Sequence, residues 1–135
     1  MNELKSPFDN LPFLSQEEAL KILATPISEL ALASDYYKAA FHLGKFPGAV
    51  TEQALLYLVE STSNEQPVVI ARKKAIEGLA RLRCVEAIPA IGSCLSSSDP
   101  YLVETSAWAL QELDCQDPSL HQVMTSLLED SYQWM

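Results

Sequence analysis

Apolar residues recur at helical spacing along most of the chain, which is the pattern of helices that bury one face. One version of this pattern appears in three segments, Ala40–Phe46, Ile76–Leu82 and Ala107–Leu113. Each segment carries a small or apolar residue, a Leu three positions later and another apolar residue three positions after that. The central leucines, at positions 43, 79 and 110, lie 36 and 31 positions apart, which indicates an internal repeat.

The spacing of 31 positions recurs in features other than hydrophobicity. Cys84 and Cys115 both follow the end of such a segment and lie 31 positions apart. Asp99-Pro100-Tyr101 is matched by Asp130-Ser131-Tyr132 at the same spacing. Repeats of this length that hold two helical patterns are typical of an α-solenoid, so we expect an all-α fold of about three helix pairs.

Turn and cap residues set the predicted helix boundaries. Pro47-Gly48 marks a turn, and Asp99-Pro100 and Asp117-Pro118 each place an N-cap acid before a proline in the first helical turn. The expected helices cover about Ser34–Phe46, Ala49–Glu60, Val68–Leu82, Val85–Leu95, Asp99–Leu113 and Pro118–Glu129.

The predicted array of repeats has a cap at its N-terminal end and an incomplete repeat at its C-terminal end. Ser15-Gln16-Glu17-Glu18 resembles a capping box that opens a helix to about Ala24, so residues 1–33 are predicted to form an N-terminal cap with an irregular start. The repeats then cover residues 34–63, 64–98 and 99–129. Residues 130–135 resemble the start of a truncated fourth repeat, which predicts a bare apolar flank and self-association through this end.

Charge narrows the class of partner. The formal net charge is −9, which argues against nucleic acid and anionic membrane surfaces. No stretch of the sequence is apolar enough to predict a membrane span, and the start of the chain does not resemble a signal peptide, so we expect a cytoplasmic location. All nine basic residues lie at or before Arg83, which leaves the C-terminal part acidic.

This segregation has two interpretations: solvated faces that happen to differ in charge, or surfaces that dock a protein. On the second interpretation the acidic docking candidates are Glu104, Glu112, Asp114 and Asp117. The basic candidates, which would line a solvent-facing side of one helix, are Arg72, Lys73, Lys74 and Arg81.

Three segments of the second and third repeats resemble the HEAT-like repeat of the phycobilisome lyase family: Ala87–Ile91, Ser98–Pro100 and Ala107–Leu110. Tyr36–Phe46 is more specifically similar to a segment of the cyanobacterial E/F-type bilin lyases. The chain departs from the family pattern at Glu104, where an Arg is usual, and in the turns Arg83-Cys84 and Asp114-Cys115, where Gly-Asp is usual.

The resemblance implies two functions. Some relatives attach, remove or isomerise linear tetrapyrroles on phycobiliprotein cysteines, often as a two-subunit complex, whereas others only bind partners. We expect a non-catalytic HEAT-repeat scaffold in a pigment-protein or iron–sulphur context, and hold as the alternative a phycobilin lyase or lyase subunit. The implied partners are a phycobiliprotein, a lyase partner subunit or an iron–sulphur assembly protein. No motif of an enzyme active site is present in the sequence, which favours a protein without catalytic activity; if the chain is an enzyme, we expect a bilin lyase.

No built-in cofactor is expected, and on the lyase alternative a phycobilin is the transient ligand. Its propionates would need cations and its pyrrole rings an aromatic wall. The residues predicted for this face are Tyr37, Lys38, His42, Lys45 and Trp108. The competing interpretation is an ordinary solvated helix face, with Trp108 and Tyr101 packed between repeats.

The cysteines give no sign of a metal site. Cys84, Cys94 and Cys115 form no Cys-x-x-Cys motif, and neither histidine stands at metal-ligand spacing from them. Equivalent turns of neighbouring repeats are too far apart for a disulfide, because packed helices are separated by about 8–10 Å. We therefore expect reduced thiols that fill turns, or that contact a partner transiently.

Overall fold

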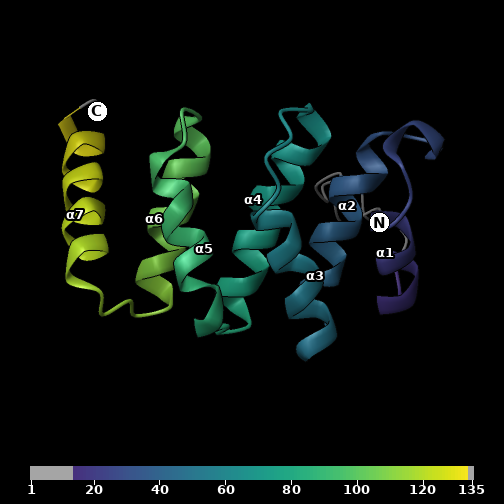
Figure 1. Cartoon of the computed structure of the whole chain (residues 1–135), viewed down its shortest axis with the longest axis horizontal. Coiled ribbons are helices and arrows are strands. Elements are labelled where there is room, and N and C mark those ends of the chain that lie inside the picture. Colours follow the sequence, from purple (N-terminus) through teal and green to yellow (C-terminus); the bar gives the residue numbers. More distant parts are fainter. Residues whose placement is uncertain (1–13, 134–135) are drawn as a thin grey trace, which may run out of the picture.

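The computed structural model describes residues 14–133, with side chains to residue 127, and this part of the chain consists of helices joined by turns and loops, without a strand. Its helices stand one after another along the long axis of the molecule (Figure 1). The α-helices are α1 Gln16–Leu23, α2 Ser34–Leu43, α3 Ala49–Val59, α4 Gln66–Arg81, α5 Ile88–Ser93, α6 Pro100–Glu112 and α7 Pro118–Gln133. The 3-10 turns are η2 Ile27–Glu29, η3 Val85–Ala87 and η4 Cys94–Ser96. The predicted all-α solenoid is confirmed.

Three helix starts follow the predicted chemistry. The Ser15 hydroxyl accepts a hydrogen bond from the Glu18 amide at 3.1 Å, and the Glu18 carboxylate accepts from the Ser15 amide at 2.9 Å, which completes a capping box. The Asp99 carboxylate accepts from the Tyr101 amide at 2.9 Å at the start of α6. Asp117 accepts from the Ser119 amide at 3.0 Å at the start of α7. These caps satisfy amides that have no partner within the helix.

Two predicted helices end or break earlier than expected. The segment predicted as one helix over Val85–Leu95 consists of η3, α5 and η4 in succession. Pro89 lies in the first turn of α5 and has no N–H to extend the helix backwards, so a tighter turn precedes it. Helix α2 ends at Leu43 instead of Phe46, and the chain continues in tight turns in which the Lys45 amide donates to the His42 carbonyl at 3.1 Å and the Phe46 amide to the Leu43 carbonyl at 3.0 Å.

The expected fourth repeat does not begin at Asp130. Helix α7 instead continues without a break through residues 130–133, so the match to Asp99-Pro100-Tyr101 is not accompanied by a new helix start. A proline follows Asp99 but Ser131 follows Asp130, and only the proline removes an amide that would continue a preceding helix. The predicted irregular start, residues 1–10, lies outside the described residues.

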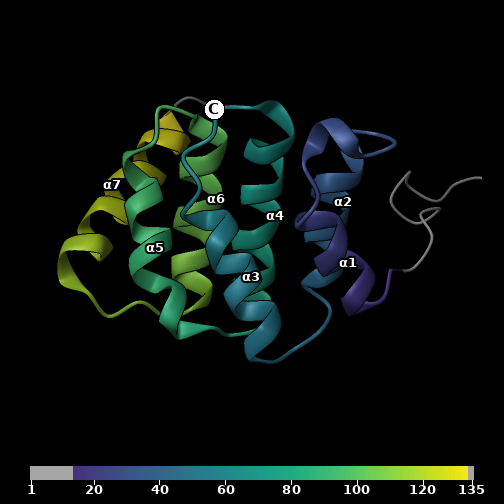
Figure 2. The ribbon, with the colours of Figure 1, turned by 45° about the vertical axis from the view of Figure 1, so that its right-hand side comes forward.

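The first helices of the three pairs pack on one another. Helix α4 lies between α2 and α6 in both ribbon views (Figure 1, Figure 2), and it contacts both. Small residues make this packing close: Ala39 and Ala40 of α2 and Ala71 and Ala75 of α4 are completely buried. A methyl group at Gly78 would lie 3.2 Å from the Gly44 Cα and 3.2 Å from the Leu55 Cδ1. The core is therefore built on a close approach of two helix backbones.

The turns after α4 and α6 have the same backbone geometry. Arg83 and Asp114 both adopt left-handed backbone, with φ of 59° and 54°. The next amide in each turn closes back on the preceding helix: Cys84 donates to the Leu79 carbonyl at 3.0 Å, and Cys115 to the Leu110 carbonyl at 3.0 Å. Cys84 and Cys115 therefore occupy the same position in neighbouring repeats, directly after a residue with left-handed backbone. The spacing of 31 positions is the length of the repeat between these two turns.

Replacing Gly78 with Ala tests the close approach. Alanine favours a helix interior over glycine by about 1 kcal/mol, so propensity alone predicts a more stable protein. We expect instead a loss of about 1–3 kcal/mol in the free energy of unfolding, because the added methyl group meets backbone that has little room to move. Urea denaturation measures the change. Arg81→Ala, at an exposed position of the same helix, is the control; a gain in stability for Gly78→Ala would contradict the packing.

Replacing Asp114 with Gly tests the left-handed turn. Glycine adopts this backbone without the steric cost that a β-carbon imposes, so we expect the free energy of unfolding to rise by about 1 kcal/mol. Gln111→Gly, at an exposed position within α6, should lower it by about the same amount. Thermal unfolding of the two variants should therefore shift the midpoint in opposite directions, and a shared direction would count against the assignment.

Candidate functional site

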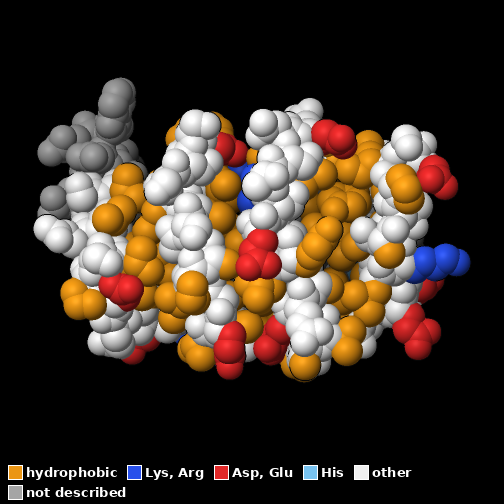
Figure 3. All heavy atoms as spheres, in the orientation of Figure 1, with side chains coloured by type: hydrophobic (Ala, Val, Ile, Leu, Met, Phe, Trp, Pro, Cys, Tyr) orange, Lys and Arg blue, Asp and Glu red, His pale blue; other side chains and the backbone are white. Residues whose placement is uncertain are grey.

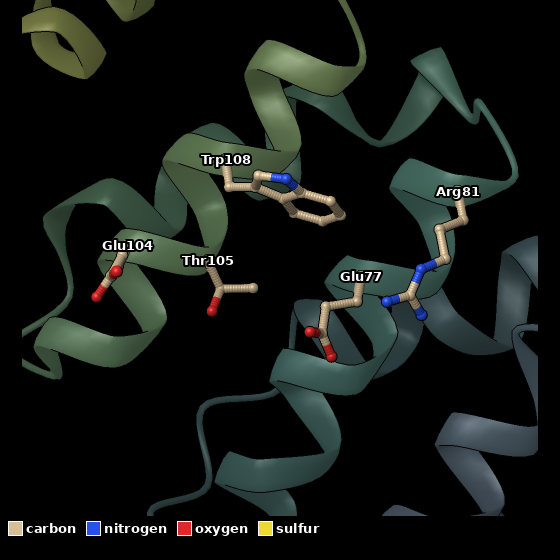
Figure 4. A pocket seen from close by; sticks show the side chains of 5 residues that line it. All are labelled: Glu77, Arg81, Glu104, Thr105 and Trp108. Carbon is tan, nitrogen blue, oxygen red and sulfur yellow. The ribbon is translucent and has the colours of Figure 1, made fainter. Parts of the chain in front are cut away.

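A cavity of about 270 Å³ opens between α4 and α6. Glu77 and Arg81 line it from α4, and Glu104, Thr105 and Trp108 line it from α6. Glu77 and Arg81 lie four residues apart, and Trp108 lies four residues after Glu104 and three after Thr105, so each helix turns these side chains towards the cavity. The indole ring of Trp108 extends from α6 towards α4, above Glu77 and beside Arg81 (Figure 4). The sequence predicted three of these residues separately, and the structure places them together.

The lining suits a flat, conjugated ligand that carries charged groups. The indole offers a planar apolar surface, Arg81 offers a guanidinium and the two glutamates offer hydrogen-bond acceptors. Tyr101 is 69% exposed, so its interpretation as core packing between repeats is wrong. Trp108 is 37% exposed and lies between α4 and α6, so it both packs between repeats and lines the cavity. Glu77 and Thr105 were missed by sequence reasoning, because only the packing of α4 against α6 makes them neighbours of Trp108.

The residues of α2 and its end that were predicted to form one ligand face differ in their exposure to solvent. Lys45 is exposed and Lys38 is half-buried, whereas Tyr37 packs against the core. His42 is only 4% exposed, so its prediction as a surface ligand residue is wrong. Burial, followed by the charge of Lys45, lowers the pKa of His42, and the imidazole is therefore neutral near pH 7. Helix α2 does not line the cavity beside Trp108.

An aromatic and cationic cluster that the sequence did not predict lies between α2 and α4. The Lys45 Nζ stands 5.0 Å and the Lys74 Nζ 5.9 Å from the centre of the Phe41 ring. The His42 ring meets the Phe41 ring edge to face, with centroids 5.5 Å apart. The spacing of Phe41 and Lys45 by four residues was the available signal. Both ammonium groups are held by cation–π attraction.

The four basic docking candidates on α4 have different surroundings. Lys73 pairs with Asp99 at 3.3 Å and stands 5.1 Å from the centre of the Tyr101 ring. Lys74 pairs with Glu77 at 3.6 Å, and Arg81 is exposed. Arg72 is only 8% exposed, so its prediction as part of a solvent-facing basic surface is wrong. Helices α3 and α6 pack against α4, and Arg72 donates to the Ser63 carbonyl in the loop after α3.

The acidic docking candidates are all on the surface: Glu104, Glu112, Asp114 and Asp117. Figure 3 shows Asp and Glu side chains over one face of the molecule, with few Lys or Arg among them. Hydrogen bonds from the Ser119 hydroxyl and amide, then from the Leu120 amide, lower the pKa of Asp117. Asp117 therefore stabilises the start of α7 as well as adding negative charge. Helix α7 leaves Val123 exposed and buries Met124, so its described apolar side is partly covered.

Cys84 lies against two carboxylates, and this cluster was missed by reasoning limited to Cys and His spacing. Its Sγ is 3.5 Å from Glu52 Oε1 and 3.7 Å from Glu86 Oε2. One ligand atom from each residue falls within 4.8 Å of the others, so the three could hold a divalent cation. Burial, then the Glu52 charge, raise the pKa of Cys84 to about 11. The thiol is therefore protonated at neutral pH and a poor nucleophile. All three cysteines are free.

Comparison with known proteins identifies the fold family. A family model described as HEAT repeats matches residues 58–135. The chain belongs to the HEAT-repeat family. None of the described helices is long and apolar enough to cross a membrane.

Named relatives come from cyanobacterial pigment systems. The chain is 50% identical over 96 residues, 70% of its length, to "Bilin biosynthesis protein CpeY" of Synechococcus sp. (strain WH8020). It is 37% identical over 120 residues, 89% of its length, to "Uncharacterized phycocyanin operon protein Y" of Pseudanabaena tenuis (strain PCC 7409). These matches span 23% and 29% of the relatives, so the chain corresponds to about a quarter of their length.

A solved structure supports the same relationship. The complex of CpcE and CpcF of phycocyanin lyase from Nostoc sp. PCC7120 contains a chain that matches with a TM-score of 0.67 and 27% identity. The match covers 92% of this chain and 46% of that one. The resemblance to the phycobilisome lyase type of HEAT-like repeat is confirmed.

The pKa of Cys84 gives a prediction for pH dependence. In a variant with Cys94→Ala and Cys115→Ala, we expect thiolate absorbance in the ultraviolet to titrate near pH 11 instead of the usual 9.0. Because the folded-state pKa is raised above the unfolded value, the stability from Cys84 is complete below pH 9.0 and declines as pH rises towards about 11. Glu52→Gln should lower the pH at the midpoint of the Cys84 titration, because it removes a negative charge that disfavours the thiolate. An unchanged midpoint in that variant would remove Glu52 as a cause.

Proposed function

We propose that this chain is the bilin-binding part of a phycobilin lyase or lyase subunit, a protein that attaches or isomerises a linear tetrapyrrole on phycobiliprotein cysteines. The observation that carries the proposal is the 50% identity over 96 residues to a protein named for bilin biosynthesis. This favours the lyase alternative over the non-catalytic scaffold that the sequence first suggested.

The cavity between α4 and α6 supplies a chemically suitable surface. The Trp108 indole can stack on pyrrole rings, and Arg81 can bind a propionate through a charge-assisted hydrogen bond. Glu77 and Glu104 can accept hydrogen bonds from pyrrole N–H groups. Its volume of about 270 Å³ is near the lower limit for small-molecule sites, about 300–1,000 Å³. The cavity would hold one part of an extended tetrapyrrole, and the remainder would contact other repeats of a longer protein.

The chain's chemistry supports binding more than covalent catalysis. Burial and neighbouring carboxylates keep the Cys84 thiol protonated, and burial also raises the pKa of Cys94. A protonated thiol does not attack the chromophore efficiently. Within this proposal the described residues orient the tetrapyrrole, and the nucleophile is the cysteine of the phycobiliprotein.

A protein partner is the second part of the proposal. The matching solved structure is a complex of two proteins, and acidic residues of this chain lie exposed near its C-terminal helices. A lyase partner subunit or a phycobiliprotein fits this setting. The iron–sulphur assembly protein stays a prediction without support from these similarities.

Fluorescence of Trp108 tests bilin binding. In the full chain with Trp134→Phe, Trp108 is the remaining tryptophan. We expect a linear tetrapyrrole such as phycocyanobilin to quench its fluorescence and to shift its own visible absorbance, because the ring would stack on the indole. Trp108→Ala should weaken bilin binding by about ten-fold, the equivalent of about 1.4 kcal/mol, so about ten times more bilin should be needed for the half-maximal absorbance change.

Tyr57→Ala is the matched control, because Tyr57 is a 75% exposed aromatic residue on α3 and does not line the cavity. It should leave the absorbance change unaltered. Equal losses in both variants would locate binding elsewhere. If no spectral change occurs with or without an apo-phycobiliprotein, while the protein partner is still captured, the scaffold function replaces the lyase function.

A further inference from the structure

A second cavity, of about 380 Å³, lies on a different part of the solenoid from the one beside Trp108. Its lining comes from the end of α3 and the loop after it, from α4, and from α5, η4 and α6. Val59 and Leu102 form part of an apolar wall, Ser97 contributes a hydroxyl, and Glu60 stands at an exposed position. Arg72 of α4 also lines this cavity.

Arg72 is a buried cation that has no counterion among the described residues. The residue is 8% exposed, and its Nη2 donates a hydrogen bond to the Ser63 carbonyl at 2.9 Å. Its Nε is buried and donates to no acceptor, and among the described residues no carboxylate forms an ion pair with it. A guanidinium has five N–H groups and cannot be deprotonated in a protein, so burial leaves a permanent charge only partly compensated.

An anion in the cavity would compensate this charge. Guanidinium groups pair best with planar oxyanions that accept two parallel hydrogen bonds. The apolar wall favours an anion attached to a hydrocarbon group, and nearby hydroxyl groups can donate further hydrogen bonds to it. Glu60 adds a negative charge near the opening, which disfavours a doubly charged phosphate more than a singly charged carboxylate.

We infer that the cavity around Arg72 is a binding site for a carboxylate carried on a small apolar group. The carboxylate would belong either to a free small molecule or to an acidic side chain of a bound protein. The site shares none of its lining residues with the cavity beside Trp108. The inference does not depend on the proposed function, and its test uses neither a bilin nor a phycobiliprotein.

Butyrate is the probe, and butyramide, which has the same shape without the charge, is its control. The full chain is titrated with each at constant ionic strength in chloride buffer. We expect butyrate, and not butyramide, to shift the N–H resonance of Arg72 Nε and to raise the melting temperature. Equal responses to the two compounds would overturn the inference, because the charge would then play no part.

Arg72→Lys keeps the positive charge and removes the planar guanidinium. We expect it to weaken butyrate binding by about ten-fold or more, measured by calorimetry, because the bidentate geometry is lost. Arg83→Lys, at an exposed position that lines neither cavity, should bind butyrate like the parent protein. Circular dichroism checks that Arg72→Lys is folded. A folded Arg72→Lys variant with unchanged affinity would overturn the inference.

Glu60 is the remaining candidate for an internal counterion. If the cavity binds an external carboxylate, Glu60→Gln should strengthen butyrate binding several-fold, because the substitution removes a charge that repels the ligand. If Glu60 compensates Arg72 in solution, Glu60→Gln should lower the melting temperature without strengthening butyrate binding. That second outcome would overturn the inference.

A second experiment with peptides distinguishes a free small carboxylate from an acidic side chain of a bound protein. A short apolar peptide with one central glutamate is compared with the same peptide carrying glutamine, both with blocked ends. Binding of butyrate supports a free small carboxylate as the ligand. Binding of the glutamate peptide alone supports an acidic side chain of a protein partner. If neither probe shifts the Arg72 resonance, the site does not bind carboxylates.

Discussion

The close approach of α2 and α4 at Gly44 and Gly78 is the constraint on which the arrangement of the repeats depends. A β-carbon at Gly78 would stand 3.2 Å from the Gly44 Cα, so larger residues there would push the two helices apart. Buried alanines on both helices continue the same surface. In a solenoid each repeat contacts only its neighbours, so the spacing at one junction sets where every later helix lies.

Helix α4 contributes residues to two cavities, one on each of two of its sides. One side places Glu77 and Arg81 opposite Trp108 of α6, and another places Arg72 beneath the loop after α3. A helix in the middle of an array is covered by more than one neighbour, so it can supply residues to two separate cavities. Both cavities present a cation beside apolar surface, and both are therefore suited to anionic, partly apolar ligands.

The ionisable groups divide into those that hold the fold and those left for partners. Lys73 and Lys74 are engaged by Asp99 and Glu77, and Asp117 caps α7. Arg81 and the acidic residues near the C-terminal helices stay exposed. Burial raises the pKa of the Cys84 and Cys94 thiols, so neither of these two thiols is an activated nucleophile at neutral pH.

The sequence by itself determined the all-helical class, the order of most helices and their repeat, because these depend on local periodicity, on caps such as Ser15 and Asp99, and on the turns at Arg83 and Asp114. Only the tertiary structure decided which faces are covered. The spacing of residues on a helix shows which side chains share a face, but not how many neighbours pack against that helix. Arg72 was expected at the surface and is buried, whereas Trp108 was weighed as core and lines an open cavity. Both outcomes follow from the positions of α3, α5 and α6 around α4, which no local pattern specifies.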